Sequence, residues 1–596
     1  MMCKMNMIFH NISNARIELG DTLINPKLVD GGVLNQYDLV VANPPFSQNY
    51  TTANMQFKER FQNWMSKKKQ ADFMFVQHMI SVLKNSGRMA VVMPHGVLFR
   101  GGEEQKMRKR LIIGSETNPS CILECVIGLP QGLFYGTGIP ASLLIINKAD
   151  AKERKGVFFI NADREYKEGK NQNSLRPEDI EKISYVYHNK IEIDGYSRMV
   201  TKEILSEEDY NCNIRRYVDN SEPPTPQDVK AHLRGGVPHD EIENLRNFFD
   251  CYKNLKNELF SEPVDGYANF TSDVKEKGDI KNIIANSNGK DEVRKTYKNV
   301  VDSFWKNSTE DIDNLFEGSL FDFNNSLTER FVTDLTRLKV LDKYQVRGSF
   351  AHFFDAMRSD FYSVQSSGWT AELIPDDELI SNEFPEVLKD LARFQNRRDE
   401  LDAKFAEIAD MDQEEWDAEQ YEIIPKTIIT EVKAEIKELK AWKRDINKEK
   451  KALEKRLKSG ASVLEELQIC TAKIAEVELR LTDKENNISR HIALENELKD
   501  CRKKIREIEI NKETLADKAR EQISDEDAKR LITARWLNNL HETIDTYLEA
   551  HIRQLQQAVE LLYDKYSVTL TSLIEERDAA TEELEKYLKE LGYISK

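Results

Sequence analysis

The sequence predicts an α/β sheet near the N-terminus, then a mainly helical region that ends in a long coiled-coil hairpin. Three observations lead to this prediction. Short apolar runs surround an amphipathic helix pattern up to about residue 160, charged helical patterns and loops continue to about residue 425, and no proline follows Pro425. We therefore expect three regions, residues 1–200, 201–425 and 426–596.

Six short apolar runs in the first region are expected to be strands buried on both faces of a sheet. They are 15–23, 37–45, 87–99, 121–129, 141–147 and 156–161. The segment 71–87 has apolar residues at helical spacing and is expected to be a helix that Gly87 stops. This alternation predicts an open, mostly parallel sheet that binds ligands at the carboxyl ends of its strands.

The middle region mixes charged helices with loops. Its proline-rich stretch 221–229 is expected to be an extended connector, and 287–292 an exposed turn. The aromatic-rich stretch 341–373 is expected to hold a helix that buries Phe350, Phe353, Phe354 and Met357, which we favour over a base-stacking surface.

The last region has apolar residues close to heptad spacing over 432–457 and again beyond residue 467. Because the break at 458–462 suits a reversal, we expect two long antiparallel helices. The motif SDED at 524–527 predicts the N-cap of another long helix that runs to the end of the chain. Such helices could form a spacer, or a platform for the helices of another subunit.

Composition limits the function. The net charge is −17, with about +5 in residues 1–150 and −22 in the remainder, so only the first region is expected to face phosphates. The apolar runs are too short to span a bilayer and no signal peptide is recognisable, which predicts a cytoplasmic protein without membrane contact. Seven scattered cysteines indicate a reduced chain with no metal site.

The stretch YDLVVANPPFSQNY at 37–50 places two prolines directly after an apolar run. Because proline lacks an N–H and fixes φ, Pro44 and Pro45 must lead the backbone out of the sheet as a stiff hook. The carbonyls of Asn43 and Pro44 and the Asn43 side chain could then accept hydrogen bonds from an amino group, while Phe46 stacks on a planar base. The alternative is a Pro-Pro turn that only ends a strand.

The motif Asn43-Pro44-Pro45-Phe46 is similar to the signature of amino-methyltransferases. Its surroundings resemble the modification (M) subunit of type I restriction-modification systems, an N6-adenine DNA methyltransferase family. The resembling segments are KMNMIFH with GDTL, ADFMFVQHM, GRMAVVMPHGVLFRGGEEQKMRKRLI, LPQGLFYGTGIPASLLIINK, NIRRYVDNSEPPTPQDVKAHLRGGVP, DKYQVRGSFAHFFDAMRSDFY and the terminal YDKYSVTLTSLIEERDAATEELEKYLKELGY. The resemblance touches nearly the whole chain.

This resemblance implies a Rossmann-like methyltransferase sheet and transfer of a methyl group from S-adenosyl-L-methionine to N6 of a flipped adenine in double-stranded DNA. It implies two partners, a specificity subunit that reads the DNA sequence and a restriction/translocase subunit. Asn43, Pro44, Pro45 and Phe46 would form the target-base site. Asp21 would contact the adenine of the cofactor, although a turn residue is an equal alternative, and Asp72 would lie near the cofactor by position.

The sequence departs from the family pattern in one respect. Family members begin with a helical domain, followed by a strand and a Gly-rich loop of the DPxxGxGG kind that wraps the methionine part of the cofactor. No GxG loop at a strand-to-helix junction occurs in this sequence. We therefore expect a C-terminal fragment with an incomplete sheet and cofactor pocket, which alone binds S-adenosyl-L-methionine weakly or not at all.

Two further interpretations stay open. The chain could be a non-catalytic, truncated interaction subunit that docks on the DNA specificity subunit. It could also methylate an RNA adenine or a glutamine side chain, because glutamine-modifying enzymes carry a related Asn-Pro-Pro motif, although the long helical tail would then be unexplained.

Overall fold

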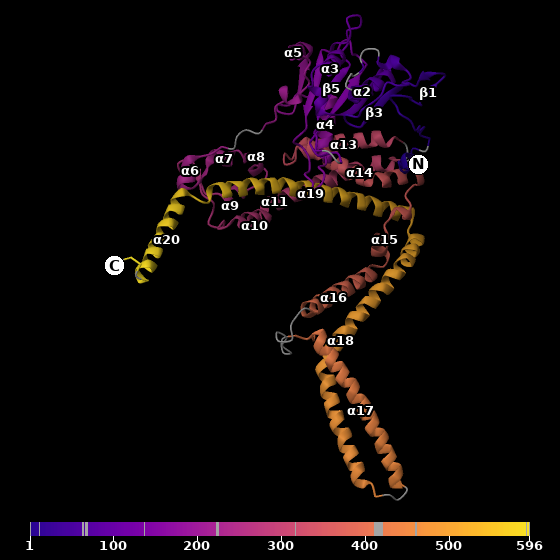
Figure 1. The fold of residues 1–596 in the computed structure, drawn as a ribbon, viewed down its shortest axis with the longest axis vertical. Helices are drawn as coiled ribbons and strands as arrows, with labels where there is room; N and C mark the ends of the chain where they lie inside the picture. The colour runs from indigo at the N-terminus through magenta and orange to yellow at the C-terminus, as the bar shows by residue number, and fades with distance from the viewer. Residues whose placement is uncertain are drawn as a thin grey trace. The chain divides into compact units, whose positions relative to one another are not determined.

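The computed structural model describes the whole chain except residues 1, 11, 13, 62–64, 66–69, 136–137, 222–225, 316–317, 410–420, 459–461, 592 and 595–596. It contains two compact units, one of residues 1–361 and 536–596 and one of residues 362–535 (Figure 1).

The first unit is built on a six-stranded sheet with the strand order β3-β4-β6-β5-β7-β8. The strands are β3 (Tyr37–Ala42), β4 (Leu83–Pro94), β5 (Leu123–Gly128), β6 (Ala141–Asn147), β7 (Gly156–Asn161) and β8 (Ser197–Thr201). Only the β3–β4 and β5–β7 pairs are parallel. The predicted α/β sheet is confirmed, but the prediction that it is mostly parallel is wrong. The short connection from Gly128 to Ala141 cannot hold the crossover helix that a parallel neighbour needs, so β6 returns antiparallel.

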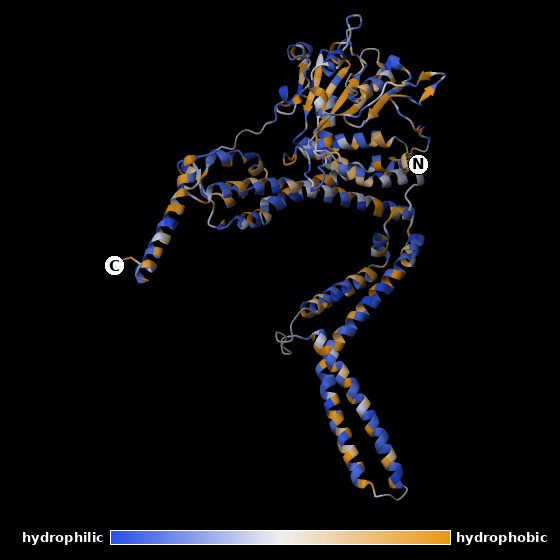
Figure 2. Cartoon of the chain, viewed as in Figure 1, coloured by the Kyte–Doolittle hydropathy of each residue, from blue (hydrophilic) through white to orange (hydrophobic). Residues whose placement is uncertain are grey.

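Helices cover both faces of this sheet, as the apolar strands require (Figures 1 and 2). On one face, α2 (Asp72–Ser81) and α3 (Glu103–Ile113) pack with β4 in a core that includes Phe73, Val91 and Leu111. On the other face, α4 (Pro177–Asn189) packs on β5 and β7 in a second core that includes Phe158 and Val186. The sheet is thereby held as a rigid base for the loops at its carboxyl edge.

Two sequence predictions near β3 are wrong. Residues 15–23 form no strand, and β3 is an edge strand of the sheet. The side chain of Leu19 is 98 % exposed, and the carboxylate of Asp21 closes a turn instead. The helix expected over 71–87 ends at Ser81, because Lys148 Nζ binds the carbonyl oxygens of Ile80 and Leu83 and the chain continues directly as β4.

The rest of the first unit is mainly helical. Its other elements are α1 (Met2–Phe9), β1 (Val29–Asp30), β2 (Val33–Leu34), η1 (Lys58–Phe61), η2 (His95–Leu98), α5 (Lys202–Glu207), η3 (Ile214–Arg216), α6 (Val229–Arg234), β9 (Val237–Pro238), α7 (His239–Glu243), α8 (Arg246–Phe249), α9 (Leu255–Leu259), β10 (Tyr267–Ala268), α10 (Lys277–Ala285), α11 (Asn288–Asn307), α12 (Thr309–Asp313), α13 (Leu320–Thr336) and α14 (Lys343–Ser367).

Of the features expected in the middle region, the aromatic helix is confirmed. Phe350, Phe353 and Phe354 of α14 are buried, and Met357 is half-buried, so these rings do not form a base-stacking surface. The exposed turn expected at 287–292 is wrong, because α11 begins at Asn288 after the buried Ser287. Part of the proline-rich connector, 222–225, lies outside the described residues; 221 and 226–228 are neither helix nor strand, and α6 begins at Val229.

The helix α19 (Asp525–Tyr566) begins as predicted, with Ser524 Oγ accepting a hydrogen bond from the N–H of Asp527 at 3.2 Å. It does not reach the end of the chain. The helix stops at Tyr566, and Thr569 caps a separate helix, α20 (Leu570–Glu590), by accepting a hydrogen bond from Ser572 N. The prediction of one continuous helix is therefore wrong.

The second unit contains the predicted hairpin. Its elements are η5 (Ala371–Leu373), α15 (Asp376–Glu383), α16 (Pro385–Ala409), α17 (Lys426–Lys458) and α18 (Leu464–Gln522). Ion pairs of Lys443 with Glu478 at 2.9 Å and of Lys433 with Glu495 at 3.1 Å show that α17 and α18 are antiparallel. The reversal itself, at 459–461, lies outside the described residues. Beyond the hairpin, α18 packs on α16 through a core that includes Leu401 and Leu498.

Candidate functional site

The Asn43–Phe46 hook lies at the carboxyl end of β3, where the ladder to β4 ends at Ala42. Pro44 is buried and anchors the hook, whereas Asn43 and Pro45 are exposed and Phe46 is half-buried. Since the two prolines donate no backbone hydrogen bond, the chain leaves the sheet here with the Asn43 side chain open to solvent. An exposed amide beside a half-buried aromatic ring can bind a planar group that carries an amino substituent.

The loop between β5 and β6 contacts the hook. The ring of Phe134 meets the ring of Phe46 edge to face, with 6.1 Å between centroids and an interplanar angle of 77°. Tyr135 follows and is 88 % exposed. The sequence separation between Phe46 and Phe134 hid this contact from the sequence analysis.

Asp72 also lies at the hook, in the first turn of α2. Its Oδ1 accepts a hydrogen bond from the backbone N–H of Ser47 at 2.7 Å, and its carboxylate forms an ion pair with Arg100 at 3.6 Å. Arg100 in turn pairs with Glu104 of α3 at 3.3 Å. Burial raises the pKa of Glu104, and the nearby Arg100 opposes this shift.

Asp21 lies in a different part of the site. Its Oδ1 accepts hydrogen bonds from the backbone N–H groups of Leu23 at 2.9 Å and Ile24 at 3.0 Å, so the carboxylate closes a turn. Next to this turn, a cavity of about 410 Å³ lies along β3, and its lining includes Gly20, Thr22 and Val41.

A buried arginine fixes the segment that carries Asp21. Arg60 donates hydrogen bonds to the carbonyl oxygens of Thr22 at 3.0 Å and Leu23 at 2.7 Å. Its Nη1 lies 2.8 Å from Nδ1 of His78 on α2. Burial, together with this cation, lowers the pKa of His78 to about 4, so the imidazole is neutral at neutral pH.

A second cavity, of about 600 Å³, opens at the carboxyl ends of β4 and β7. Its lining comprises His95, Phe99, Gln131, Pro140, Asp163, Arg164, Tyr166, Asn213 and Arg215. Arg215 pairs with Asp163 at 2.8 Å, and burial lowers the pKa of His95. The loop that supplies Gln131 also supplies Phe134 to the hook, so the cavity and the hook share one structural element. No sequence prediction included this cavity. Gln131 follows the predicted strand 121–129, and Asp163, Arg164 and Tyr166 follow the predicted strand 156–161, whereas Asn213 and Arg215 follow no predicted strand.

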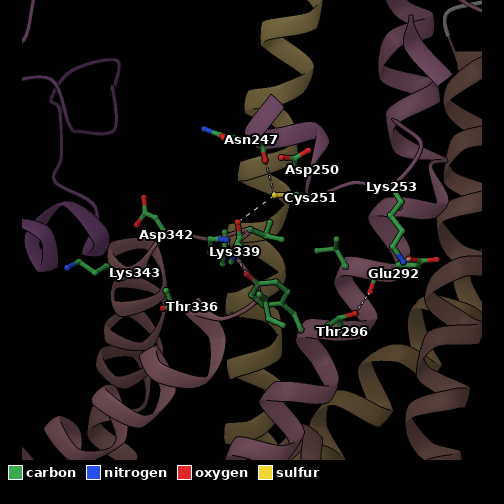
Figure 3. Close-up of a pocket in the computed structure, with 16 residues that line it drawn as sticks. Asn247, Asp250, Cys251, Lys253, Glu292, Thr296, Thr336, Lys339, Asp342 and Lys343 are labelled. Atoms are coloured by element: carbon green, nitrogen blue, oxygen red, sulfur yellow. Dashed lines mark hydrogen bonds and ion pairs between the residues drawn. The ribbon is translucent and has the colours of Figure 1, made fainter. Parts of the chain in front are cut away.

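A third cavity, of about 790 Å³, lies among helices of the middle region (Figure 3). Its thiol, Cys251, donates hydrogen bonds to the carbonyl oxygens of Asn247 and Lys339, and burial raises the pKa of that thiol. Lys253 and Glu292 neutralise each other at 2.8 Å. Acidic and basic side chains are balanced and no strong nucleophile is present, so we do not assign this cavity a role.

The described residues contain no cluster of three or more His, Cys, Asp or Glu side chains suited to a metal ion. Within the same residues, no helix is long and apolar enough to cross a membrane.

Several known proteins are similar to the part of the chain that carries these features. Residues 1–224 match the family model of N-6 DNA methylases. The type I restriction enzyme MjaVIII methylase subunit of Methanocaldococcus jannaschii is 34 % identical over 281 residues, which cover 44 % of this chain and 46 % of that protein. The MpnII methylase subunit of Mycoplasma pneumoniae is 31 % identical, with 39 % of this chain and 43 % of that protein covered.

Among solved structures, a type I methyltransferase subunit from Streptococcus thermophilus aligns at 36 % identity with a TM-score of 0.33, covering 37 % of this chain and 46 % of that one. The chain thus spans about half the length of the relatives that it matches. Residues 1–224, which carry the hook, match the model of the N-6 DNA methylase family, and the chain is similar to the methylase subunits of type I restriction enzymes.

Proposed function

We propose that this chain is the methyltransferase subunit of a type I restriction-modification complex and methylates N6 of an adenine flipped out of duplex DNA. The observation that carries the proposal is the Asn43–Phe46 hook, which leaves the sheet at the carboxyl end of β3 with its amide exposed. The family match over residues 1–224 supports it.

The hook suits an exocyclic amino group. The Asn43 side-chain oxygen and the Pro44 carbonyl accept the two amino hydrogens, which draws the nitrogen lone pair out of conjugation with the ring and aims it at the methyl donor. Phe46 stacks on the flipped base, with Phe134 supporting its ring. The methylated nitrogen is transiently cationic and loses a proton to water, so no strong side-chain base is needed.

The described residues fit the base better than the methyl donor. S-adenosyl-L-methionine supplies an electrophilic methyl group, and we infer that Asp21 and the cavity along β3 face the cofactor. However, one oxygen of Asp21 already closes a turn. The sequence also lacks a GxG loop at a strand-to-helix junction. We therefore assign no residue of this chain to the methionine part of the cofactor.

We assign DNA contact to the sheet-bearing region. Residues 1–150 are the basic part of an acidic chain, and Arg164 and Arg215 line the cavity that shares a loop with the hook. Because the chain as a whole carries −17, we assign sequence recognition and most DNA affinity to a specificity subunit. A restriction/translocase subunit would complete the complex. We assign docking of the partner subunits to the long helices of this chain.

The test is reconstitution of this chain with its specificity subunit. The product, N6-methyladenine in duplex DNA, is measured by mass spectrometry of digested DNA. Asn43→Ala should lower kcat by about a hundredfold or more, because it removes a hydrogen-bond acceptor from the reacting amine. Asn43 is exposed, so thermal unfolding should stay unchanged. Undiminished methylation by Asn43→Ala would refute the base site.

The incomplete donor site favours a second candidate function, a non-catalytic subunit that docks on the specificity subunit. Calorimetry on the chain alone tests whether the donor site is incomplete, because we expect no micromolar binding of S-adenosyl-L-methionine by the isolated chain. If the reconstituted complex assembles on DNA without any methylation, the docking function is the correct one. Micromolar cofactor binding by the isolated chain would instead show that its donor site is complete.

A further inference from the structure

We propose that Asp72 is a positioning residue that fixes the pose of the Asn43–Phe46 hook through the backbone of Ser47, and that Arg100 holds Asp72 in place. This inference rests on the proposed function of the hook. It gives Asp72 a role other than the cofactor contact expected from its sequence position.

The backbone of Ser47 has an unfavourable conformation. This residue directly follows Phe46 and has a φ of 53°, a left-handed conformation that non-glycine residues rarely adopt. Its N–H donates to Asp72 Oδ1 at 2.7 Å. This charge-assisted hydrogen bond joins Ser47 to a residue 25 positions further along the chain. It holds the unfavourable conformation and, with it, the direction in which the hook leaves the sheet.

The carboxylate of Asp72 is buried. Asp72 is 2 % exposed, and its Oδ2 has no hydrogen-bond partner among the described residues. The guanidinium of Arg100, 3.6 Å away, supplies the compensating positive charge. A buried carboxylate is tolerated when it is paired in this way, and the same pairing fixes its orientation.

The surroundings of Arg100 favour its position beside Asp72. Its guanidinium lies where a Cβ at residue 96 would lie, so a residue larger than Gly96 would displace Arg100. The same Nη1 that faces Asp72 also pairs with Glu104 at 3.3 Å. Two separate segments, one with Asp72 and one with Arg100 and Glu104, thereby meet at the backbone amide that follows the hook.

A simpler interpretation is that Asp72 only stabilises the N-terminus of α2, where negative charge is favourable. The two interpretations differ in what they predict. A helix-terminal charge would affect stability alone, whereas a positioning residue affects the rate of methyl transfer and the amide of Ser47.

The experiment uses the reconstituted complex with Asp72→Ala, Asp72→Asn and the control Asp38→Ala. Asp38 lies on β3 in an exposed ion pair with Lys84 at 2.7 Å, so the control removes a paired carboxylate from the same strand that carries the hook. Asp72→Ala should lower kcat by about a hundredfold without raising the KM for DNA, because a small misplacement of reacting groups has such an effect. Asp72→Asn keeps an oxygen acceptor and should recover most of kcat. Asp38→Ala should have the same kcat and the same KM for DNA as the wild type.

A second measurement does not depend on methylation. In the segment 43–47 only Asn43, Phe46 and Ser47 carry a backbone N–H, because the other two residues are prolines. Hydrogen exchange of a peptide that covers this segment therefore reports closely on Ser47. Its amide should be protected in the wild type and in Asp72→Asn, and exchange freely in Asp72→Ala.

The outcomes separate this inference from the proposed function. If Ser47 stays protected in Asp72→Ala, or if that variant loses only thermal stability while kcat is unchanged, the positioning role is refuted. If Asn43→Ala retains full activity, the base site is wrong, whatever Asp72 does. If the wild-type complex methylates nothing but the Ser47 amide still loses protection in Asp72→Ala, the contact between Asp72 and Ser47 is confirmed and the proposed function is refuted.

Discussion

The ring of Phe134, from the loop between β5 and β6, meets the ring of Phe46 edge to face at 6.1 Å. Such a pair contributes about 1 kcal/mol beyond its buried area. We expect Phe134→Ala to weaken flipping of the target base by roughly fivefold, which 2-aminopurine fluorescence at the target position measures. Phe134→Tyr keeps the ring and should behave as the wild type. If Phe134→Ala gives the same 2-aminopurine fluorescence as the wild type, the ring contact does not support Phe46.

The cavity at the carboxyl ends of β4 and β7 leads to a prediction about DNA binding. If Arg215 contacts a phosphate, Arg215→Ala should reduce the slope of log K against log salt concentration by about 0.9. Its neighbour Arg216 pairs with Glu208 and does not line the cavity, so Arg216→Ala is the matched control. Equal slopes for the two variants would exclude a phosphate contact by Arg215.

Acid should destabilise the first unit through His78. Burial and the cation of Arg60 lower its pKa to about 4, below the ordinary value of 6.5, so the unfolded chain binds the proton first. Stability is therefore complete above about pH 6.5 and decreases as the pH falls toward 4, by up to about 3 kcal/mol. Thermal unfolding between pH 7 and pH 4.5 measures this decrease. His78→Gln keeps an acceptor for Arg60 and should flatten the pH dependence; an unchanged pH dependence would contradict the assignment.

The seam of the hairpin should be sensitive to truncation. Ile488 of α18 is 2 % exposed and packs in a cluster with Ile436 of α17. Ile488→Ala should lower the free energy of unfolding by about 2–5 kcal/mol, measured by circular dichroism in urea. Leu479 lies on the same helix and is 75 % exposed, so Leu479→Ala should change it by less than about 0.5 kcal/mol. Similar losses in both variants would place the seam elsewhere.

Local chemistry explains which elements could be predicted from the sequence. The apolar runs at β3 to β7 and the heptad spacing of α17 and α18 are strong signals, and a strand or helix formed at each, although the edge strand β3 is not buried on both faces. The errors have different causes. The apolar run at 15–23 predicts a strand, but the local turn that Asp21 closes competes with it. The helix pattern at 71–87 continues past Ser81, but Lys148 caps the helix there.

The candidate site divides in the same way. The amino acid sequence by itself determined the hook, because two adjacent prolines fix φ and remove the donors that a ladder needs, whatever surrounds them. Only the tertiary structure decided that Ser47 takes a left-handed backbone bound to Asp72, that Phe134 meets Phe46, and that Arg100 balances a buried carboxylate. These contacts join segments far apart in the chain, and their energies depend on distance and burial, which no local pattern specifies.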